Sequence, residues 1–352
     1  MDVSKELLFL VGATAVGKTA VALELAERLG SEIINADSRQ VYRGMDIGTS
    51  KPNQADQTRV RHHLLDVVEP EERFSAGIYK RLAEEVIAHQ HARGRIALVV
   101  GGTGLYLKAL AYGLWTGPSA NWSIRSRWLE KQRQHGEGYL HQRLQEVDPV
   151  SAAKIHVRDT VKIIRALEVY ELEGQPLSYF HEQHRFKEHR WKVIWIGLRR
   201  TRQDLYQRIE QRIDEMVSAG MIEEVKRLMS REYSGLPIGH LCQTPAMQGL
   251  GYRHLRDHFN GATSWEAALK RWRRDTKRFA KRQETWFKAE PGIVWFDLEP
   301  KESADQTAEK ILIWLETHQR LTRSLRHSSA FQMNRRVGPT GGRQVKGGGI
   351  CV

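Results

Sequence analysis

The sequence predicts an α/β fold in which a parallel sheet is flanked by helices. Short apolar runs occur at residues 7–11, 32–36, 96–100, 192–198 and 293–298. Runs of this length without polar alternation are typical of strands buried on both faces. Segments with helical periodicity separate them, and strands that alternate with helices form parallel sheets. We therefore expect a sheet covered by helices on both faces.

The elements follow one another as βα units. The run LLFLV at residues 7–11 leads through a glycine loop into a helical pattern at 19–29. A second helical pattern at 75–91 precedes the strand at 96–100, and a long one covers 204–228. Each pattern repeats its apolar positions at helical spacing, which predicts helices that pack on the sheet.

Between residues 118 and 190 the strand signal disappears. This polar segment has candidate helices at 122–134, 138–146 and 161–172, and it predicts a helical insertion. Four regions are therefore expected: residues 1–117 as the first part of the core, 118–190 as the insertion, 191–320 as the completion of the core, and 321–352 as a disordered basic tail.

Composition excludes several classes of protein. No apolar run approaches the roughly 20 residues that a membrane-spanning helix needs, so a membrane-spanning protein is excluded. The N-terminus shows neither an Arg/Ser-rich leader nor a small-residue cleavage site, which predicts a cytoplasmic protein. Cys242 and Cys351 have no partner at C-x-x-C spacing, which excludes a disulfide framework and a Cys-based zinc finger.

The net charge of +13 is concentrated in two segments. Residues 270–288 hold nine Lys/Arg and two acidic residues, and residues 317–352 hold seven Lys/Arg and no acidic residue. Local basicity of this kind indicates a surface that meets a polyanion. On the helical pattern that begins at Trp265, an apolar stripe is expected to be core, with base stacking by Trp272 or Trp286 as the alternative; its residues are Leu269, Trp272, Phe279 and Trp286.

Residues 12–19 read GATAVGKT and match the phosphate-binding pattern G-x-x-x-x-G-K-[ST] between a strand and a helix. The sheet is therefore expected to be P-loop NTPase-like. The glycines let backbone N–H groups curl round a phosphate, and the helix N-terminus adds partial positive charge. Lys18 can neutralise phosphate oxygens, and the hydroxyl of Thr19 can bind Mg²⁺.

Two further strand ends carry polar residues. Asp37 follows the second strand and is placed to act as a general base or to hold metal, although a lone Asp can also cap a turn. The strand at 96–100 ends in GGTG, without the aspartate that holds metal in typical P-loop ATPases. Transfer to an acceptor is thus better supported than hydrolysis of ATP.

Together these segments resemble the bacterial tRNA dimethylallyltransferases, which prenylate adenosine 37 of tRNA. The resemblance spans about residues 7–313. It rests on GATAVGKT (12–19), NADSRQVYRGMDIGTSKP (35–52), GGTGLY (101–106), RALEV (165–169), RIEQR (208–212), GYR (251–253) and KRQETWF (281–287). The segment at 35–52 is the most specific, because ordinary nucleotide kinases lack it.

The resemblance implies that the loop holds the diphosphate of dimethylallyl diphosphate. The diphosphate-binding residues would be Gly12, Ala13, Thr14, Ala15, Val16, Gly17, Lys18 and Thr19. Asp37 would accept the N6 proton of adenine, Thr103 would contact the adenosine, and Arg212 would stabilise the leaving group with Lys18 and a Thr19-bound Mg²⁺. The catalytic residues implied are therefore Asp37, Thr103 and Arg212, and the cofactor is Mg²⁺.

The resemblance also implies contacts with the tRNA anticodon loop, from which the target base must be flipped out. These contacts would come from Asp37, Ser38, Arg39, Gln40, Thr103, Arg125, Val161, Lys162, Ile163, Ile164, Arg165, Gln248, Gly249, Leu250, Gly251, Tyr252 and Arg253. In the segment 161–165 apolar residues surround the charges, so part of it is expected to be helix core, with Lys162 and Arg165 as the contacts.

Two alternatives remain open at this point. A small-molecule kinase would share the phosphate loop but needs no RNA surface, and the two basic segments argue against it. A non-catalytic RNA-binding protein would not need Lys18, Thr19 and Asp37 together. No dimerisation stripe remains once the core is filled, so a monomer is expected.

Overall fold

The computed structural model describes residues 6–115, 117–184, 191–230, 244 and 246–318. The chain divides into two compact units, one formed by residues 1–108 and 191–352 and the other by residues 109–190. The expected insertion at 118–190 lies within the second unit, which begins at residue 109. The expected tail at 321–352 lies outside the described residues. No helix in the described part is long and apolar enough to cross a membrane.

The first unit is built on a six-stranded parallel sheet with the order β3-β2-β4-β1-β5-β6. The strands are β1 (Glu6–Gly12), β2 (Ile33–Asn35), β3 (His62–His63), β4 (Ala97–Gly101), β5 (Lys192–Arg199) and β6 (Ile293–Asp297). In the register, Leu10 of β1 lies opposite Val100 on one side and Ile196 on the other. The predicted parallel α/β sheet is confirmed, and β3 is an addition.

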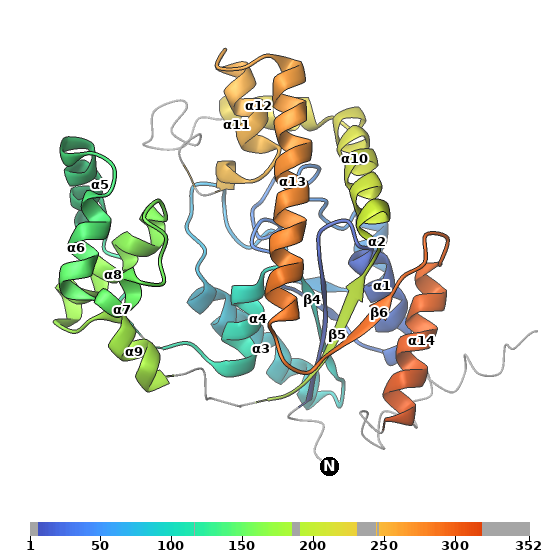
Figure 1. Cartoon of the computed structure of the whole chain (residues 1–352). Coiled ribbons are helices and arrows are strands. Elements are labelled where there is room, and N and C mark those ends of the chain that lie inside the picture. The colour runs from blue at the N-terminus through green and yellow to red at the C-terminus, as the bar shows by residue number, and fades with distance from the viewer. Residues whose placement is uncertain (1–5, 116, 185–190, 231–243, 245, 319–352) are drawn as a thin grey trace, which may run out of the picture. The chain divides into compact units, whose positions relative to one another are not determined.

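Helices lie on both sides of this sheet (Figure 1). They are α1 (Lys18–Leu29), α2 (Gln54–Arg59), α3 (Ala76–Ala92), α4 (Gly104–Tyr112), α10 (Arg202–Ser218), α11 (Met221–Ser230), η3 (Ala246–Gln248), α12 (Tyr252–Phe259), α13 (Trp265–Lys288) and α14 (Ala304–Thr317). Of these helices, α11 and α12 form a group beyond the sheet with one end of α13. The expectation of a single helix over residues 204–228 is wrong. The segment forms two helices, because Gly220 adopts a φ of +103° between them, which favours glycine and ends the first helix.

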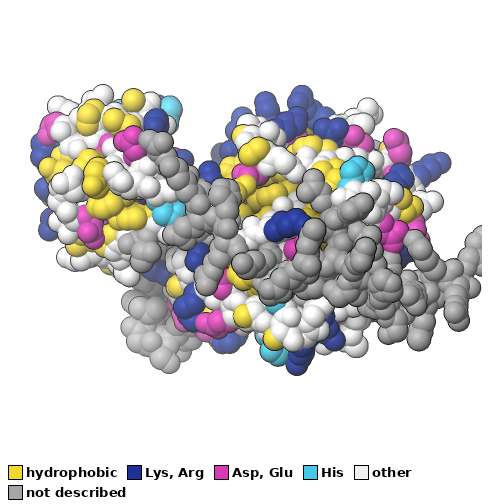
Figure 2. Space-filling view, turned by 90° about the horizontal axis from the view of Figure 1, so that it is seen from below, with side chains coloured by type: hydrophobic (Ala, Val, Ile, Leu, Met, Phe, Trp, Pro, Cys, Tyr) yellow, Lys and Arg dark blue, Asp and Glu magenta, His cyan; other side chains and the backbone are white. Residues whose placement is uncertain are grey.

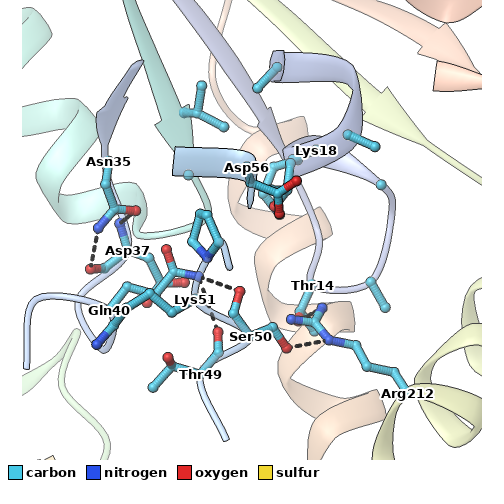
Figure 3. A pocket seen from close by; sticks show the side chains of 18 of the residues that line it. Thr14, Lys18, Asn35, Asp37, Gln40, Thr49, Ser50, Lys51, Asp56 and Arg212 are labelled. Atoms are coloured by element: carbon cyan, nitrogen blue, oxygen red, sulfur yellow. Dashed lines mark hydrogen bonds between the residues drawn. The ribbon is translucent and has the colours of Figure 1, made fainter. Parts of the chain in front are cut away.

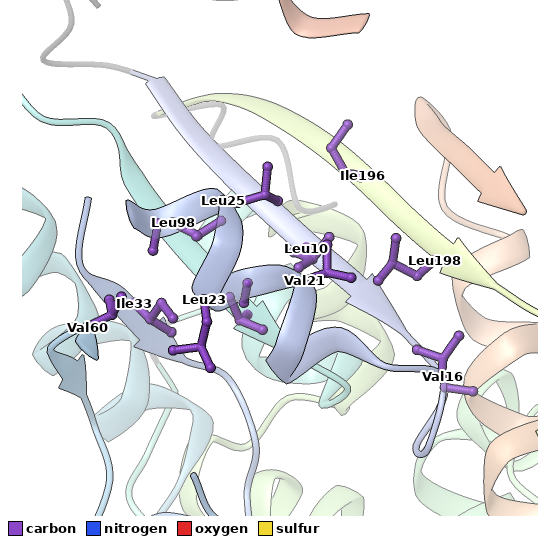
Figure 4. Packing of buried hydrophobic residues seen from close by; sticks show 14 of the residues in the cluster. Leu10, Val16, Val21, Leu23, Leu25, Ile33, Val60, Leu98, Ile196 and Leu198 are labelled. Carbon is purple, nitrogen blue, oxygen red and sulfur yellow. The ribbon is translucent and has the colours of Figure 1, made fainter. Parts of the chain in front are cut away.

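Part of the core of this unit lies between the sheet and α1 (Figure 4). Leu10, Leu98 and Ile196 point from three neighbouring strands and are fully buried, and Val21 and Leu25 of α1 meet them. Burying an aliphatic side chain of this size stabilises the fold by roughly 1.5–3 kcal/mol. This packing fixes the start of α1, and with it the loop that joins α1 to β1.

The second unit is helical and has its own core. It contains the end of α4 and the helices α5 (Trp122–His135), α6 (Tyr139–Val147), α7 (Pro149–Ala152), α8 (Thr160–Glu173) and α9 (Leu177–His184). Trp128, Leu144 and Leu167 are buried in its centre. The expected helices at 122–134, 138–146 and 161–172 are confirmed to within two residues at their ends.

Candidate active site

The carboxyl ends of β2, β4 and β1 bring three sequence motifs together. These strands are neighbours in the sheet, and Asp37, Thr103 and Gly12 lie at or just beyond their ends. The hydroxyl oxygen of Thr103 accepts a hydrogen bond of 2.9 Å from the backbone N–H of Ser38. One carboxylate oxygen of Asp37 accepts a hydrogen bond of 2.8 Å from the N–H of Arg39. The predicted residues Asp37 and Thr103 therefore share one edge of the sheet, where ligands of parallel sheets bind.

Two cavities meet at this edge. One of about 420 Å³ is lined by Thr14, Lys18, Thr19, Asp37 and Arg212, among others (Figure 3). A second cavity of about 320 Å³ shares Thr14, Asp37 and Arg212 with the first and extends to Thr103. Because Asp37 and Arg212 line both, a group bound in one cavity lies next to a group bound in the other. The geometry suits a reaction between two substrates.

The phosphate loop owes its shape to backbone conformations that few residues tolerate. Gly12 and Gly17 have φ values of +152° and +113°. A Cβ atom on Gly12 would lie 2.6 Å from the carbonyl oxygen of Leu198. The guanidinium groups of Arg200 and Arg208 donate hydrogen bonds of 2.9 and 3.0 Å to the loop carbonyls of Val16 and Ala15. These contacts hold the loop ready to accept a phosphate.

Lys18 and Arg212 supply positive charge at the first cavity. The ammonium group of Lys18 donates hydrogen bonds of 3.0 and 2.9 Å to the carbonyl oxygens of Gly12 and Ala13. Burial lowers the pKa of Lys18 to about 8, while Asp37 opposes the shift and Arg212 adds to it. Lys18 is thus still mostly protonated at pH 7. A bound anion would raise the pKa of Lys18 back toward its ordinary value, because an opposite charge favours the protonated form.

Arg212 of α10 reaches the same cavity from the other side. Its Nε donates a hydrogen bond of 2.6 Å to the hydroxyl of Ser50, and one Nη donates to the hydroxyl of Thr14 at 3.4 Å (Figure 3). Burial lowers the pKa of Arg212, against the attraction of Asp37, but arginine stays charged at neutral pH. Two cations whose hydrogen-bond partners are neutral carbonyls and hydroxyls form a site for a polyanion.

Gln283 of α13 is a residue of this site that the sequence analysis missed. Its side-chain oxygen accepts a hydrogen bond of 2.9 Å from the N–H of Thr14, and its Nε2 donates one of 2.9 Å to the carbonyl of Gly102. A Cβ atom on Gly102 would lie 2.3 Å from that Nε2, and one on Gly104 would lie 2.5 Å from the ring of Trp286. The glycines of GGTG are therefore needed for the close approach of α13.

The apolar stripe of α13 is only partly core. Trp272 is 2% exposed, as expected of a core residue, and Trp286 is half-buried against Gly104. Phe279, however, is 37% exposed and lines both cavities. Figure 1 shows α13 passing from the group that it forms with α11 and α12 to the sheet. The helix therefore contributes apolar surface to the site.

Glu224 of α11 is the second residue that was missed. Its carboxylate is buried and accepts hydrogen bonds of 2.9, 2.9 and 3.1 Å from the backbone N–H groups of Asp46, Ile47 and Gly48. The hydroxyl of Tyr252 donates a fourth, of 2.6 Å. These bonds fix the loop that continues to Ser50, the partner of Arg212. Glu224 therefore supports the phosphate site without lining either cavity.

We expect Glu224→Gln to weaken both stability and binding of the anionic substrate. The side-chain amide N–H₂ of glutamine would face N–H and O–H donors at a position where the carboxylate accepts their hydrogen bonds. The free energy of unfolding should therefore fall by about 2–3 kcal/mol. The KM for the substrate that occupies the phosphate loop should rise several-fold, since the loop that holds Ser50 loosens. Denaturant unfolding and steady-state kinetics measure these effects. Glu223→Gln, on the exposed neighbour, should leave both near wild type; equal behaviour of the two variants would contradict this role.

The tRNA-binding residues expected in the first unit divide into two groups. Arg39 lines the second cavity together with Ser38, Gln248, Gly249, Leu250 and Arg253. Gln40 instead donates hydrogen bonds to the carbonyls of Thr49 and Ser50, which ties two parts of one loop together. Tyr252 also lines the second cavity, although it is 1% exposed and its hydroxyl donates a hydrogen bond to Glu224. Gly251 has a φ of +87°, and a Cβ atom there would lie 2.8 Å from the ring of Trp272, so its role is to let that ring approach.

In the helical unit the buried carboxylate of Glu168 organises two predicted residues. Arg125 donates two hydrogen bonds to it, of 2.8 and 2.7 Å, and Arg165 donates a third of 2.6 Å. Ile163 and Ile164 are buried in the core of this unit, which confirms that part of the segment 161–165 is helix core and corrects the inclusion of these two side chains among the tRNA contacts. Val161 and Lys162 are exposed at the start of α8.

Acidic residues of another helix neutralise part of the positive charge of α13, which the count of charges along the sequence did not show. Arg273 pairs with Asp214 and Lys277 with Glu210, both on α10. Figure 2 shows groups of Lys and Arg side chains on the face it presents, with Asp and Glu between them. Acidic residues that lie far away in the sequence thus neutralise part of the helix, which a window of consecutive residues cannot reveal.

Comparison with known proteins places these features in a family. A family model described as IPP transferase matches residues 40–290, which include Gln40, Thr103, Arg212, Glu224 and Gln283. The chain belongs to the IPP transferase family. This transferase is 46% identical to the tRNA dimethylallyltransferase of Syntrophobacter fumaroxidans over 83% of each chain. It is also 46% identical to the tRNA dimethylallyltransferase of Geobacter metallireducens, over 83% of this chain and 92% of the relative.

A solved structure resembles this IPP transferase over most of its length. The tRNA isopentenylpyrophosphate transferase of Bacillus halodurans superposes with a TM-score of 0.64 and is 35% identical, with 90% of this chain and 98% of that chain covered. The matched portion includes both the α/β and the helical parts at this coverage. The fold class predicted from the sequence is thereby confirmed at the level of the family.

Proposed function

We propose that this transferase moves the dimethylallyl group of dimethylallyl diphosphate to N6 of adenosine 37 in tRNA and releases diphosphate. The observation that carries the proposal is the meeting of two cavities at Asp37 and Arg212. The first cavity has a phosphate loop and two cations. The second opens from Asp37 and Thr103 toward a partly aromatic wall that includes Phe279. The names of the relatives agree with this pairing of substrates.

The reaction follows from these positions. The bond from C1 of the allyl group to the diphosphate oxygen breaks, the bond from C1 to N6 forms, and the carboxylate of Asp37 takes the proton that N6 loses. Lys18, Arg212 and the N–H groups of the phosphate loop stabilise the charge that develops on the departing diphosphate. Holding both substrates in adjoining cavities removes much of the entropic barrier to their encounter.

Mg²⁺ fits this site as a companion of the diphosphate. The hydroxyl of Thr19 lines the first cavity and is a hard oxygen ligand. In the described part of the chain no group of three or more His, Cys, Asp or Glu side chains could hold a metal ion by itself. Mg²⁺ is often held by few protein ligands together with substrate phosphates. When bound, it would neutralise charge on the diphosphate.

A mass measurement tests the proposal. An unmodified anticodon stem-loop with adenosine at position 37 is incubated with the protein, dimethylallyl diphosphate and Mg²⁺, and a parallel tube holds ATP. We expect the RNA to gain one C5 prenyl unit, and fragmentation should place it on the adenosine 3′ of the anticodon. No gain in mass, with turnover of ATP in the second tube, would instead support a kinase.

A further inference from the structure

Asp275 lies at the centre of a cluster of cations on α13 and α12. One carboxylate oxygen accepts hydrogen bonds of 3.1 Å from Arg253 and of 3.1 Å from Nε2 of His254. The other accepts one of 2.9 Å from Arg274 and lies 3.7 Å from the guanidinium of Arg278. The Asp275 side chain is 17% exposed, whereas those of Arg253, Arg274 and Arg278 are 38%, 52% and 64% exposed. The acid is covered, and its cations face solvent.

The charges in this cluster do not cancel. Burial opposes ionisation of Asp275, but hydrogen bonds from Arg274 and His254 outweigh it and lower its pKa to about 2. Burial lowers the pKa of His254, so its imidazole donates a hydrogen bond at neutral pH without adding a full charge. Three guanidinium groups around one carboxylate leave a net charge of about +2. The cluster therefore still attracts anions.

The cluster begins at the second cavity. Arg253 lines that cavity together with Asp37 and Thr103, and Arg282, one turn beyond Arg278 on α13, lines it as well. Arg274 and Arg278 continue from Arg253 along the exposed side of α13. A chain of cations thus leads from the site of the acceptor base onto the surface.

We propose that Asp275 is a positioning residue that gathers Arg253, Arg274 and Arg278 into a preformed binding cluster for RNA phosphates next to the target nucleotide. The proposal rests on the function proposed above, since it assumes an RNA substrate. Three neighbouring guanidinium groups repel one another and their long side chains are mobile when free. A shared carboxylate holds them in place before RNA arrives, which reduces the entropy lost on binding.

The sign of one substitution tests this role. Asp275→Asn removes a negative charge from a surface that binds a polyanion, and simple electrostatics then predicts tighter binding. If Asp275 positions the arginines, the same variant should bind an anticodon stem-loop about three- to tenfold more weakly. Binding is measured on the full-length chain without a prenyl donor, by anisotropy of a labelled stem-loop at two salt concentrations.

Glu266→Gln is the matched control. Glu266 is exposed in the first turn of the same helix, and its replacement removes the same charge. It should leave affinity unchanged or raise it slightly. Binding by Asp275→Asn that equals or exceeds that of Glu266→Gln would overturn the proposal.

A second variant separates positioning from loss of structure. Asp275→Glu keeps the charge and should recover most of the affinity, and the KM for the prenyl donor should remain at the wild-type value in both variants. A weakened Asp275→Asn protein whose Asp275→Glu counterpart is equally weak, or whose prenyl-donor KM rises in step, would show a structural role and reject the proposal. Because RNA binding is read without catalysis, a protein that binds RNA but transfers no prenyl group would fail the proposed function and still answer this test.

Discussion

Replacement of Asp37 by Asn is expected to slow prenyl transfer by about 10³-fold or more while affinity for the stem-loop stays within about twofold. A carboxamide cannot accept the N6 proton, and loss of a positioned base costs about 10²–10⁴ in rate. The remaining side-chain oxygen can still accept the N–H of Arg39, which forms the turn at this position. The effect should therefore lie in chemistry. Single-turnover rates at saturating concentrations of both substrates measure it.

Asp257→Asn serves as the control for this variant. Asp257 lies on α12, pairs with Arg256, and lines neither cavity. Its replacement should change the single-turnover rate by less than about twofold, as is usual for a surface ion pair. A rate near wild type for Asp37→Asn would exclude Asp37 as the base. Loss of RNA binding with an unchanged rate for bound RNA would make Asp37 a positioning residue.

Five of the six strands could be predicted from the sequence because each of them is a local apolar pattern. The apolar residues at 7–11, 96–100 and 194–198 are buried on both faces of the sheet, so their composition alone marks them. β3, by contrast, has two residues, His62 and His63, and neither is apolar. It forms because it pairs with β2 at the sheet edge, and pairing of this kind leaves no mark in a window of consecutive residues.

The residues of the phosphate site that belong to local motifs were predictable, whereas those that reach it from distant helices were not. The residues of GATAVGKT act through their own backbone, and Asp37 and Thr103 follow strands that the sequence reveals. Gln283 and Glu224 hold loops of the site from distant parts of the sequence. Gln283 is 269 residues from its partner Thr14, and Glu224 is 178 residues from its partner Asp46. Gln283 lies in the segment KRQETWF that carries part of the resemblance, but neither its neighbours nor those of Glu224 indicate which groups these side chains contact, so only the folded chain shows what they hold.

Burial accounts for the corrections. Ile163 and Ile164 belong to a segment that the resemblance associates with tRNA, but helix α8 turns these two side chains inward. A segment can be assigned from resemblance, whereas the inward and outward faces of its helix depend on packing against α5 and α6. The charge of α13 likewise depends on Asp214 and Glu210, which only the fold brings next to it.

Replacement of Lys18 by Ala is expected to reduce kcat/KM for the prenyl donor by about 10²–10³-fold. The ammonium group is held over the loop by the carbonyls of Gly12 and Ala13, and in the proposed reaction it contacts the diphosphate both when that group binds and when it departs. Removal of one such charge-stabilising donor costs about 10²–10³ in rate. Affinity for the stem-loop should change little, because Lys18 lines the first cavity and does not line the second.

The division of the Lys18→Ala effect between kcat and KM shows when the charge acts. A rise in KM alone would mean that Lys18 binds the diphosphate equally before and during departure, whereas an added fall in kcat means that it stabilises the leaving group in the transition state. We expect both, since the negative charge on the diphosphate increases as the C1–O bond breaks. Lys18→Arg keeps a cation but not its reach to both carbonyls, so it should restore KM more than kcat. Unchanged kinetics in Lys18→Ala would show that the phosphate loop does not take part in the reaction. Lys18 and Arg212 would then have to bind an anion other than the diphosphate of the prenyl donor.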